Sequence, residues 1–199
     1  MKSLQTRCVI KRQSLKNKIA VAKNRNIILG VTASIAIYKA CDIVRQLKNE
    51  GFSVTVIMTP EAEEFIQPIL FQSLSGNKVY RGLFQEPEAW EIEHVALAEK
   101  ADVVLLAPAT ANIIAKIACG ICDDLLTCVC CATKAPVLIC PAMNENMYQN
   151  RITQDNIKKL KSLGYKFVDP IKGRLACGKM GVGCLAEVET IIKEVKKIL

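Results

Sequence analysis

The chain has few of the residues on which many metal and membrane sites depend. Its 199 residues include one histidine and one tryptophan, and aromatic residues make up only 5%. The single histidine, His94, lies apart in sequence from the cluster of cysteines at 119–131, so the spacing of a mixed cysteine and histidine zinc site is not present. The longest apolar stretch is interrupted by Lys116 and Asp123 before it reaches the roughly 20 residues that cross a membrane as a helix. We therefore expect no metal and no membrane partner.

Acidic residues are absent from residues 1–26, which carry eight lysines and arginines. The net charge of the whole chain is +8, so the remainder is formally neutral. A basic stripe on the folded surface, and with it a nucleic-acid partner, is therefore not expected. We expect residues 1–25 to form a basic N-terminal extension and residues 26–199 to form one domain. A transit peptide is the alternative interpretation of the extension.

The sequence also lacks the apolar core of a secretory signal, although it contains ten cysteines. Thiols without a secretion signal indicate a reducing compartment, so a cytoplasmic location is expected. Cys119 and Cys122 have the CxxC spacing of zinc sites and redox pairs, but no second CxxC accompanies them. Cys128, Cys130 and Cys131 follow in an apolar stretch, where free cysteine acts as a small hydrophobic residue.

Apolar runs and helical periodicity alternate along the chain. The patterns predict strands at residues 26–31, 52–58, 103–107, 136–140 and 166–168. They predict helices at 34–50, in short pieces over 60–75, at 111–118, 123–133 and 153–163, and from Glu187 onward. Strands that alternate with helices predict a single, doubly wound, Rossmann-like α/β domain with a mostly parallel sheet. Ligands of such folds bind beyond the carboxyl ends of the strands.

Four segments carry the candidate chemistry: 30–36 (GVTASIA), 107–113 (APATANI), 141–148 (PAMNENMY) and 175–183 (LACGKMGVG). The first three follow or end predicted strands. Segment 30–36 is a strand-to-helix turn with hydroxyl groups, which suits a phosphate; alternatively, Thr32 or Ser34 only caps the helix. It contains neither a P-loop nor a GxGxxG motif. The glycines of segment 175–183 favour a mobile lid.

These four segments occur in the order found in the homo-oligomeric flavin-containing cysteine decarboxylases, and the chain resembles that family. His94, which lies between the predicted strand at 52–58 and segment 107–113, is part of the resemblance. The resemblance extends from about Asn26 to Glu187. It implies that His94 and Cys177 are catalytic and that Asn144 and Met143 bind the substrate. It also implies FMN as the cofactor, bound by Ala33, Ser34, Ile35, Thr59, Pro108, Ala109, Thr110, Asn112 and Ala142.

Five positions depart from the family's usual pattern. Ala33, Ile113 and Tyr148 stand where the family often has glycine, threonine and tryptophan. Lys179 and Cys184 stand where it usually has an acid and arginine. The last two changes alter the charge of the segment expected to close over the substrate.

The resemblance implies FMN-dependent decarboxylation of phosphopantothenoylcysteine to phosphopantetheine in coenzyme A biosynthesis. It implies a homo-oligomer, either a trimer or a dodecamer built of trimers, with the site between subunits. Because the chain ends at Leu199, we expect a separate ligase to supply the substrate. Three alternatives stay open: a peptidyl-cysteine decarboxylase, a non-catalytic regulatory flavoprotein and a prenylated-flavin synthase. Turnover of phosphopantothenoylcysteine compared with a peptide ending in cysteine distinguishes the first of these.

Overall fold

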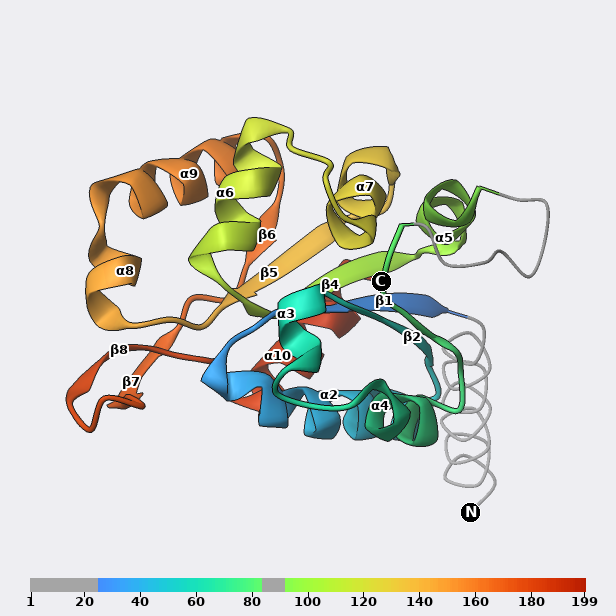
Figure 1. The fold of residues 1–199 in the computed structure, drawn as a ribbon, viewed down its shortest axis with the longest axis horizontal. Coiled ribbons are helices and arrows are strands. Elements are labelled where there is room, and N and C mark those ends of the chain that lie inside the picture. The colour runs from blue at the N-terminus through green and yellow to red at the C-terminus, as the bar shows by residue number, and fades with distance from the viewer. Residues whose placement is uncertain (1–24, 84–91) are drawn as a thin grey trace, which may run out of the picture.

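The protein, examined as a computed structural model, is described over residues 25–83 and 92–199 (Figure 1). Strands and helices alternate along it, as the sequence predicts. The strands are β1 (Asn26–Val31), β2 (Ser53–Met58), β3 (Val79–Tyr80), β4 (Val103–Ala109), β5 (Val137–Pro141), β6 (Lys166–Phe167), β7 (Ile171–Arg174) and β8 (Met180–Cys184). The helices are the 3-10 turn η1 (Ile35–Ile37), α2 (Tyr38–Asn49), α3 (Pro60–Glu63), α4 (Pro68–Ser75), α5 (Glu93–Lys100), α6 (Ala111–Cys119), α7 (Leu125–Ala132), α8 (Glu145–Gln149), α9 (Arg151–Ser162) and α10 (Val188–Ile198).

Six strands form one sheet in the order β3-β2-β1-β4-β5-β6, and all its neighbouring strands are parallel. The chain moves outward in one direction from β1 to β3 and in the other from β4 to β6. The topological switch therefore lies between β1 and β4, where ligands of doubly wound sheets bind. This arrangement confirms the predicted Rossmann-like α/β class. The remaining strands, β7 and β8, form a separate antiparallel hairpin.

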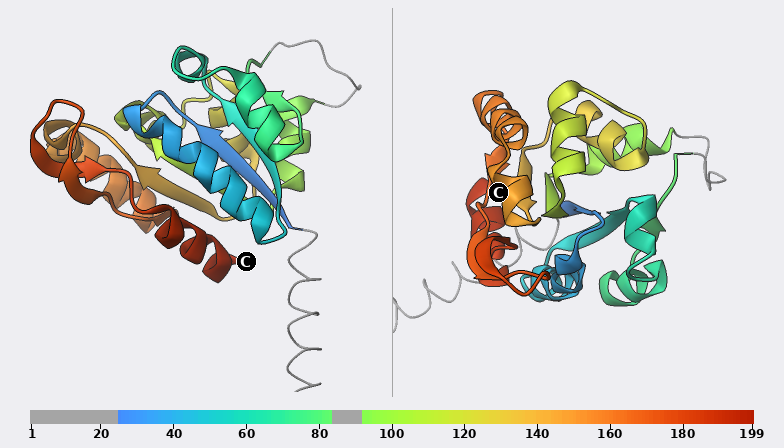
Figure 2. Two further views of the ribbon diagram at one scale, coloured as in Figure 1. Left: turned by 90° about the horizontal axis from the view of Figure 1, so that it is seen from below. Right: turned by 60° about the vertical axis from the view of Figure 1, so that its left-hand side comes forward.

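The sheet divides the apolar core into two layers because successive strand residues point to opposite faces. Leu29 and Leu105 belong to one layer, which α2, α4 and α10 cover; Ile28 and Leu106 belong to the other. Figures 1 and 2 show α6, α7 and α9 on the second face. At Gly30, an added Cβ would lie 2.5 Å from side-chain atoms of both Leu106 and Leu126. Glycine here lets α7 approach the sheet closely.

The main differences from the predicted elements concern short or irregular pieces. The helix expected at 34–50 is divided into η1 and α2, and β4 and β5 continue to Ala109 and Pro141. The patterns did not predict α5, α8 or the two-residue strand β3, and they did not predict that segment 175–183 lies in a hairpin. Helix α8 contains five residues, less than two helical turns, which is too short for a clear apolar period.

The first described residue is tied to the sheet. Arg25 pairs with Asp102 at 2.7 Å, and the same carboxylate accepts the Asn26 backbone N–H at 2.7 Å. Burial raises the pKa of Asp102, but these two hydrogen bonds outweigh it and bring the pKa below its usual value. Strand β1 begins at Asn26, and the predicted boundary between the extension and the domain stays a prediction. The proposed extension otherwise lies outside the described residues, so its role stays a prediction.

Within residues 25–83 and 92–199, no helix is long and apolar enough to span a membrane.

Candidate active site

Thr32 joins the first candidate segment to the second. The residue is buried directly after β1, and its Oγ1 donates to the Pro108 carbonyl at 2.8 Å. The same oxygen accepts the backbone N–H of Thr110 at 3.1 Å. Both interactions cross the switch point between β1 and β4. Sequence reasoning considered Thr32 only as a helix cap or phosphate ligand, and missed this cross-link between loops 76 and 78 residues apart.

Ser34 and Ala142 join the first segment to the third. Ser34 Oγ caps η1 by accepting the Ala36 N–H at 3.4 Å, and it donates to the Ala142 carbonyl at 3.1 Å. The Ala142 N–H in turn donates to the Ala109 carbonyl at 3.0 Å. Small side chains therefore surround the carboxyl ends of β1, β4 and β5. Pro108, Ala109 and Ala142 are themselves buried, whereas Thr110 is partly exposed.

The third and fourth segments are joined through the hairpin. The Met143 N–H donates to the Gly183 carbonyl at 3.0 Å. An added Cβ on Gly183 would lie 2.1 Å from the Met143 carbonyl oxygen, so only glycine permits this approach. Cys177 lies exposed in the turn between β7 and β8. The structure thus brings the hairpin that carries Cys177 to the chain that leads into Asn144.

Several helices begin at this same edge of the sheet. Thr59 is the buried N-cap of α3, Thr110 caps α6 through the Ile113 N–H at 3.4 Å, and Asn144 caps α8 through the Asn146 N–H at 2.9 Å. Asn112 is exposed in the first turn of α6. Helix N-termini carry partial positive charge and free N–H groups. Their convergence with hydroxyl side chains favours an anionic group such as a phosphate.

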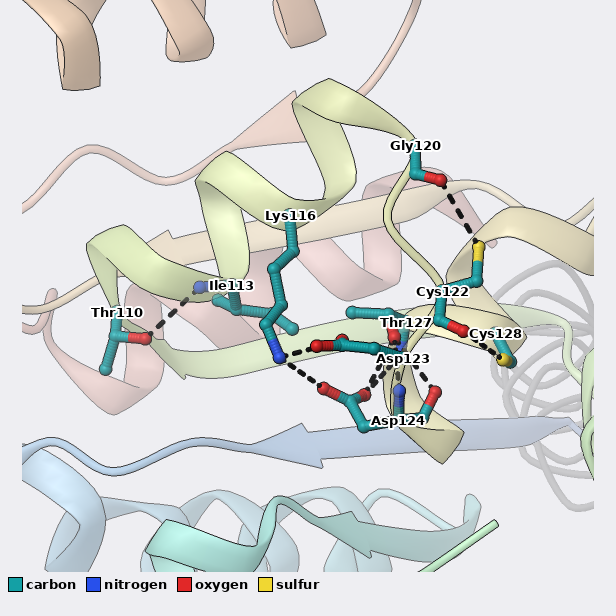
Figure 3. Close-up of polar contacts among 9 residues, drawn as sticks. All are labelled: Thr110, Ile113, Lys116, Gly120, Cys122, Asp123, Asp124, Thr127 and Cys128. Carbon is teal, nitrogen blue, oxygen red and sulfur yellow. Dashed lines mark hydrogen bonds and ion pairs between the residues drawn. The ribbon is translucent and has the colours of Figure 1, made fainter.

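The far end of α6 is braced by an ion-pair network (Figure 3). Lys116 Nζ lies 2.8 Å from Asp123 and 3.1 Å from Asp124, and Asp124 also caps α7 through the Thr127 N–H at 2.8 Å. The contact with Asp123, followed by that with Asp124, raises the pKa of Lys116, so its ammonium group is charged at neutral pH. The network links the C-terminal half of α6 to the loop and the N-cap of α7.

The CxxC candidate lies beside this network. Figure 3 shows the Cys122 thiol directed to the Gly120 carbonyl, 3.7 Å away, and the Cys128 thiol to the Cys122 carbonyl, 3.4 Å away. Burial, followed by the nearby Cys122, raises the pKa of Cys128. Among the described residues, no group of three or more histidine, cysteine or acidic side chains could hold a metal ion. These contacts give the thiols a structural role in the α6–α7 loop.

His94 is the predicted site residue that the chain does not bring to the others. It lies half-buried in the first turn of α5. In Figure 1, α5 stands at the right of the molecule, whereas α8 and the hairpin stand at the left. The side chains of Ile92 and Val95, close to His94 in the sequence, are 64% and 38% exposed. A histidine with exposed apolar side chains on either side is suited to contact a second protein surface.

Comparison with known proteins adds a family assignment. The Flavoprotein family matches residues 16–199. A probable phosphopantothenoylcysteine decarboxylase of Streptococcus mutans is 45% identical over 177 residues, covering 88% of this chain and 99% of that protein. The coenzyme A biosynthesis bifunctional protein CoaBC of Bacillus subtilis is 46% identical over 174 residues, covering 87% of this chain. The chain spans only 43% of the length of that bifunctional relative.

Solved structures show the same likeness. A cysteine-to-serine mutant of PPC decarboxylase complexed with pantothenoylaminoethenethiol has a TM-score of 0.76 at 29% identity, covering 87% of this chain and 97% of that one. The FMN-dependent cysteine decarboxylase SpaF has a TM-score of 0.78 at 27% identity, covering 89% of this chain and 98% of that one. Both likenesses extend over almost the whole described domain.

Proposed function

The chain belongs to the Flavoprotein family, and from this premise we propose that it is an FMN-dependent decarboxylase of phosphopantothenoylcysteine in coenzyme A biosynthesis. The observation that supports this most is the chain of hydrogen bonds that joins all four candidate segments at one edge of the sheet. The relative from Streptococcus mutans, which is matched over 99% of its length, supports the substrate. The expected location is the cytoplasm.

The residues at the sheet edge fit a flavin mononucleotide. The Thr59 hydroxyl, with the backbone at Ala33 and Ile35, would hold the phosphate at the N-terminal ends of η1 and α3. Ser34 would join them by turning its hydroxyl from the Ala142 carbonyl to the phosphate. The flat ring would lie against the small or cyclic residues Pro108, Ala109 and Ala142, with Thr110 and Asn112 beside it. When bound, the flavin supplies reversible two-electron chemistry, and the protein supplies position and protons.

The substrate contacts are proposed for the start of α8. Asn144 would donate its side-chain amide to the substrate carboxylate, since its Oδ1 already accepts the Asn146 N–H. Met143 would pack beside it; its backbone N–H donates to the Gly183 carbonyl.

Oxidation of the substrate's CH2–SH group to C=S makes loss of CO2 possible, because the remaining electron pair is conjugated with C=S. His94 would move a proton during this oxidative half, and Cys177 would donate one to carbon in the reductive half.

Two measurements test the proposal. The purified protein should show flavin absorbance, and the released cofactor should match FMN in chromatography. It should also release CO2 from phosphopantothenoylcysteine faster than from a peptide ending in cysteine. A colourless protein that takes up no added FMN would overturn the flavin assignment. Preference for the peptide would favour a peptidyl-cysteine decarboxylase, and FMN binding without turnover of either substrate would favour a regulatory flavoprotein.

We also propose that the active site is completed by a second copy of the chain, in a trimer or a dodecamer of trimers. The separation of α5 from α8 within one chain supports this. His94→Asn and Asn144→Ala should each inactivate the protein, whereas mixed oligomers of the two variants should regain part of the activity. The regain arises because some sites then combine an intact His94 with an intact Asn144. Light scattering gives the mass; a fully active monomer would contradict the proposal.

A further inference from the structure

The β7–β8 hairpin is not part of the central sheet, and something else must hold it. Gly173 pairs with Gly181 and Arg174 with Met180, and the turn closes through the Leu175 N–H, which donates to the Lys179 carbonyl at 2.8 Å. An isolated two-stranded hairpin is at best marginally stable in water. The position of Cys177 at its tip therefore depends on the contacts that attach the hairpin to the domain.

Glu145 supplies one of these attachments by a side chain. It is the first residue of α8, directly after Asn144, and its Oε1 accepts the Val182 backbone N–H at 2.9 Å. Another attachment, between Met143 and Gly183, uses backbone atoms only. The two contacts lie on either side of Asn144 in the sequence. The hairpin is thus attached to the two residues that flank the proposed carboxylate-binding side chain.

Gly181 allows the carboxylate to lie against β8. An added Cβ on Gly181 would be 2.6 Å from Glu145 Oε2 and 2.8 Å from its carboxyl carbon. Helix α8 packs against β8, and Figures 1 and 2 both show the two side by side. A glycine in a strand often marks such a close approach. A hydrogen bond to an ionised acceptor is stronger than one between neutral groups.

We propose that Glu145 is a positioning residue that fastens the Cys177 hairpin to the start of α8. Through Val182, it keeps the turn that carries Cys177 in a constant relation to Asn144. The catalytic consequence rests on the proposed function: proton delivery from Cys177 requires a well-placed hairpin, whereas loss of CO2 depends on His94 and Asn144. The attachment itself does not depend on the proposed function.

Limited tryptic digestion tests the attachment, with cleavage after Lys172, Arg174 and Lys179 followed by mass spectrometry. Glu145→Ala removes the acceptor and should raise the rate of hairpin cleavage by roughly tenfold, which corresponds to the loss of one hydrogen bond to a charged group. Glu145→Gln keeps an acceptor oxygen and should restore most of the protection. Glu194→Ala, which removes only the exposed pair with Lys197, is the matched control and should leave cleavage unchanged.

The product ratio tests the catalytic consequence. In Glu145→Ala the ratio of enethiol to fully reduced product should rise several-fold while CO2 release changes little, and Glu145→Gln should return the ratio toward that of the unaltered protein. A variant that was only less stable would lose CO2 release and formation of the fully reduced product to the same extent. If the unaltered protein turns over no substrate, the proposed function fails while the digestion still tests the attachment.

A second variant covers the case in which Glu145→Ala does not fold. Gly181→Ala displaces the Glu145 carboxylate from the hairpin side and should raise hairpin cleavage in the same way. Unchanged cleavage in whichever of these two variants folds would overturn the proposal. So would equal deprotection by Glu145→Gln and Glu145→Ala, because the acceptor oxygen would then have no role.

Discussion

Replacing His94 with asparagine is expected to stop the reaction before any CO2 leaves the substrate. Asparagine keeps a polar side chain of similar size but cannot take up and release a proton near neutral pH, as the imidazole can. Loss of a general acid–base group lowers rates by about 10² to 10⁴-fold. The measurement is CO2 release in a single turnover with phosphopantothenoylcysteine, alongside the amount of substrate consumed.

The control for this variant is Glu99→Gln, an exposed position on the same helix, α5. It should release CO2 at the rate of the unaltered protein. Both variants should keep the oligomeric mass and the thermal unfolding midpoint. Normal CO2 release by His94→Asn would show that the histidine has no part in the chemistry, and that its exposed surroundings serve subunit contact alone.

Replacing Cys177 with serine should instead separate the two halves of the reaction. Oxidation and loss of CO2 should continue, since His94 and Asn144 are intact. The final step needs a proton at carbon, and serine's hydroxyl is a far weaker acid than a thiol, whose unperturbed pKa is about 8.5. The enethiol should therefore accumulate, and the fully reduced product should fall by about 10² to 10⁴-fold. Mass spectrometry of the quenched reaction distinguishes the two products.

Among the solved relatives, a cysteine-to-serine mutant of PPC decarboxylase is complexed with pantothenoylaminoethenethiol. Cys119→Ser is the matched control, because Cys119 is also exposed but lies at the end of α6. It should give the fully reduced product at the normal rate. If Cys177→Ser also did so, Cys177 would only be part of the hairpin, and another group would supply the proton.

The regular part of the fold follows from local sequence pattern. The apolar run of β4 can be satisfied only by burial on both faces, and its alternation with amphipathic helices such as α2 predicts a parallel sheet. Because parallel strands end at one edge, the sequence also predicts that segments 30–36, 107–113 and 141–148 meet there. Sequence pattern therefore identified the class of fold and the candidate segments.

Tertiary structure decided how those segments are joined. Thr32 reaches Pro108 and Ser34 reaches Ala142 across separations of 76 and 108 residues, and no local periodicity contains such a pairing. No local sequence pattern shows why glycine is required at positions 181 and 183. Glycine is required there because Glu145 and Met143, which lie outside the hairpin, leave no space for a Cβ. The place of His94 likewise depends on α5, which packs on α7 away from α8. Distances between elements arise from packing, so residues that act through such contacts become visible only in the folded chain.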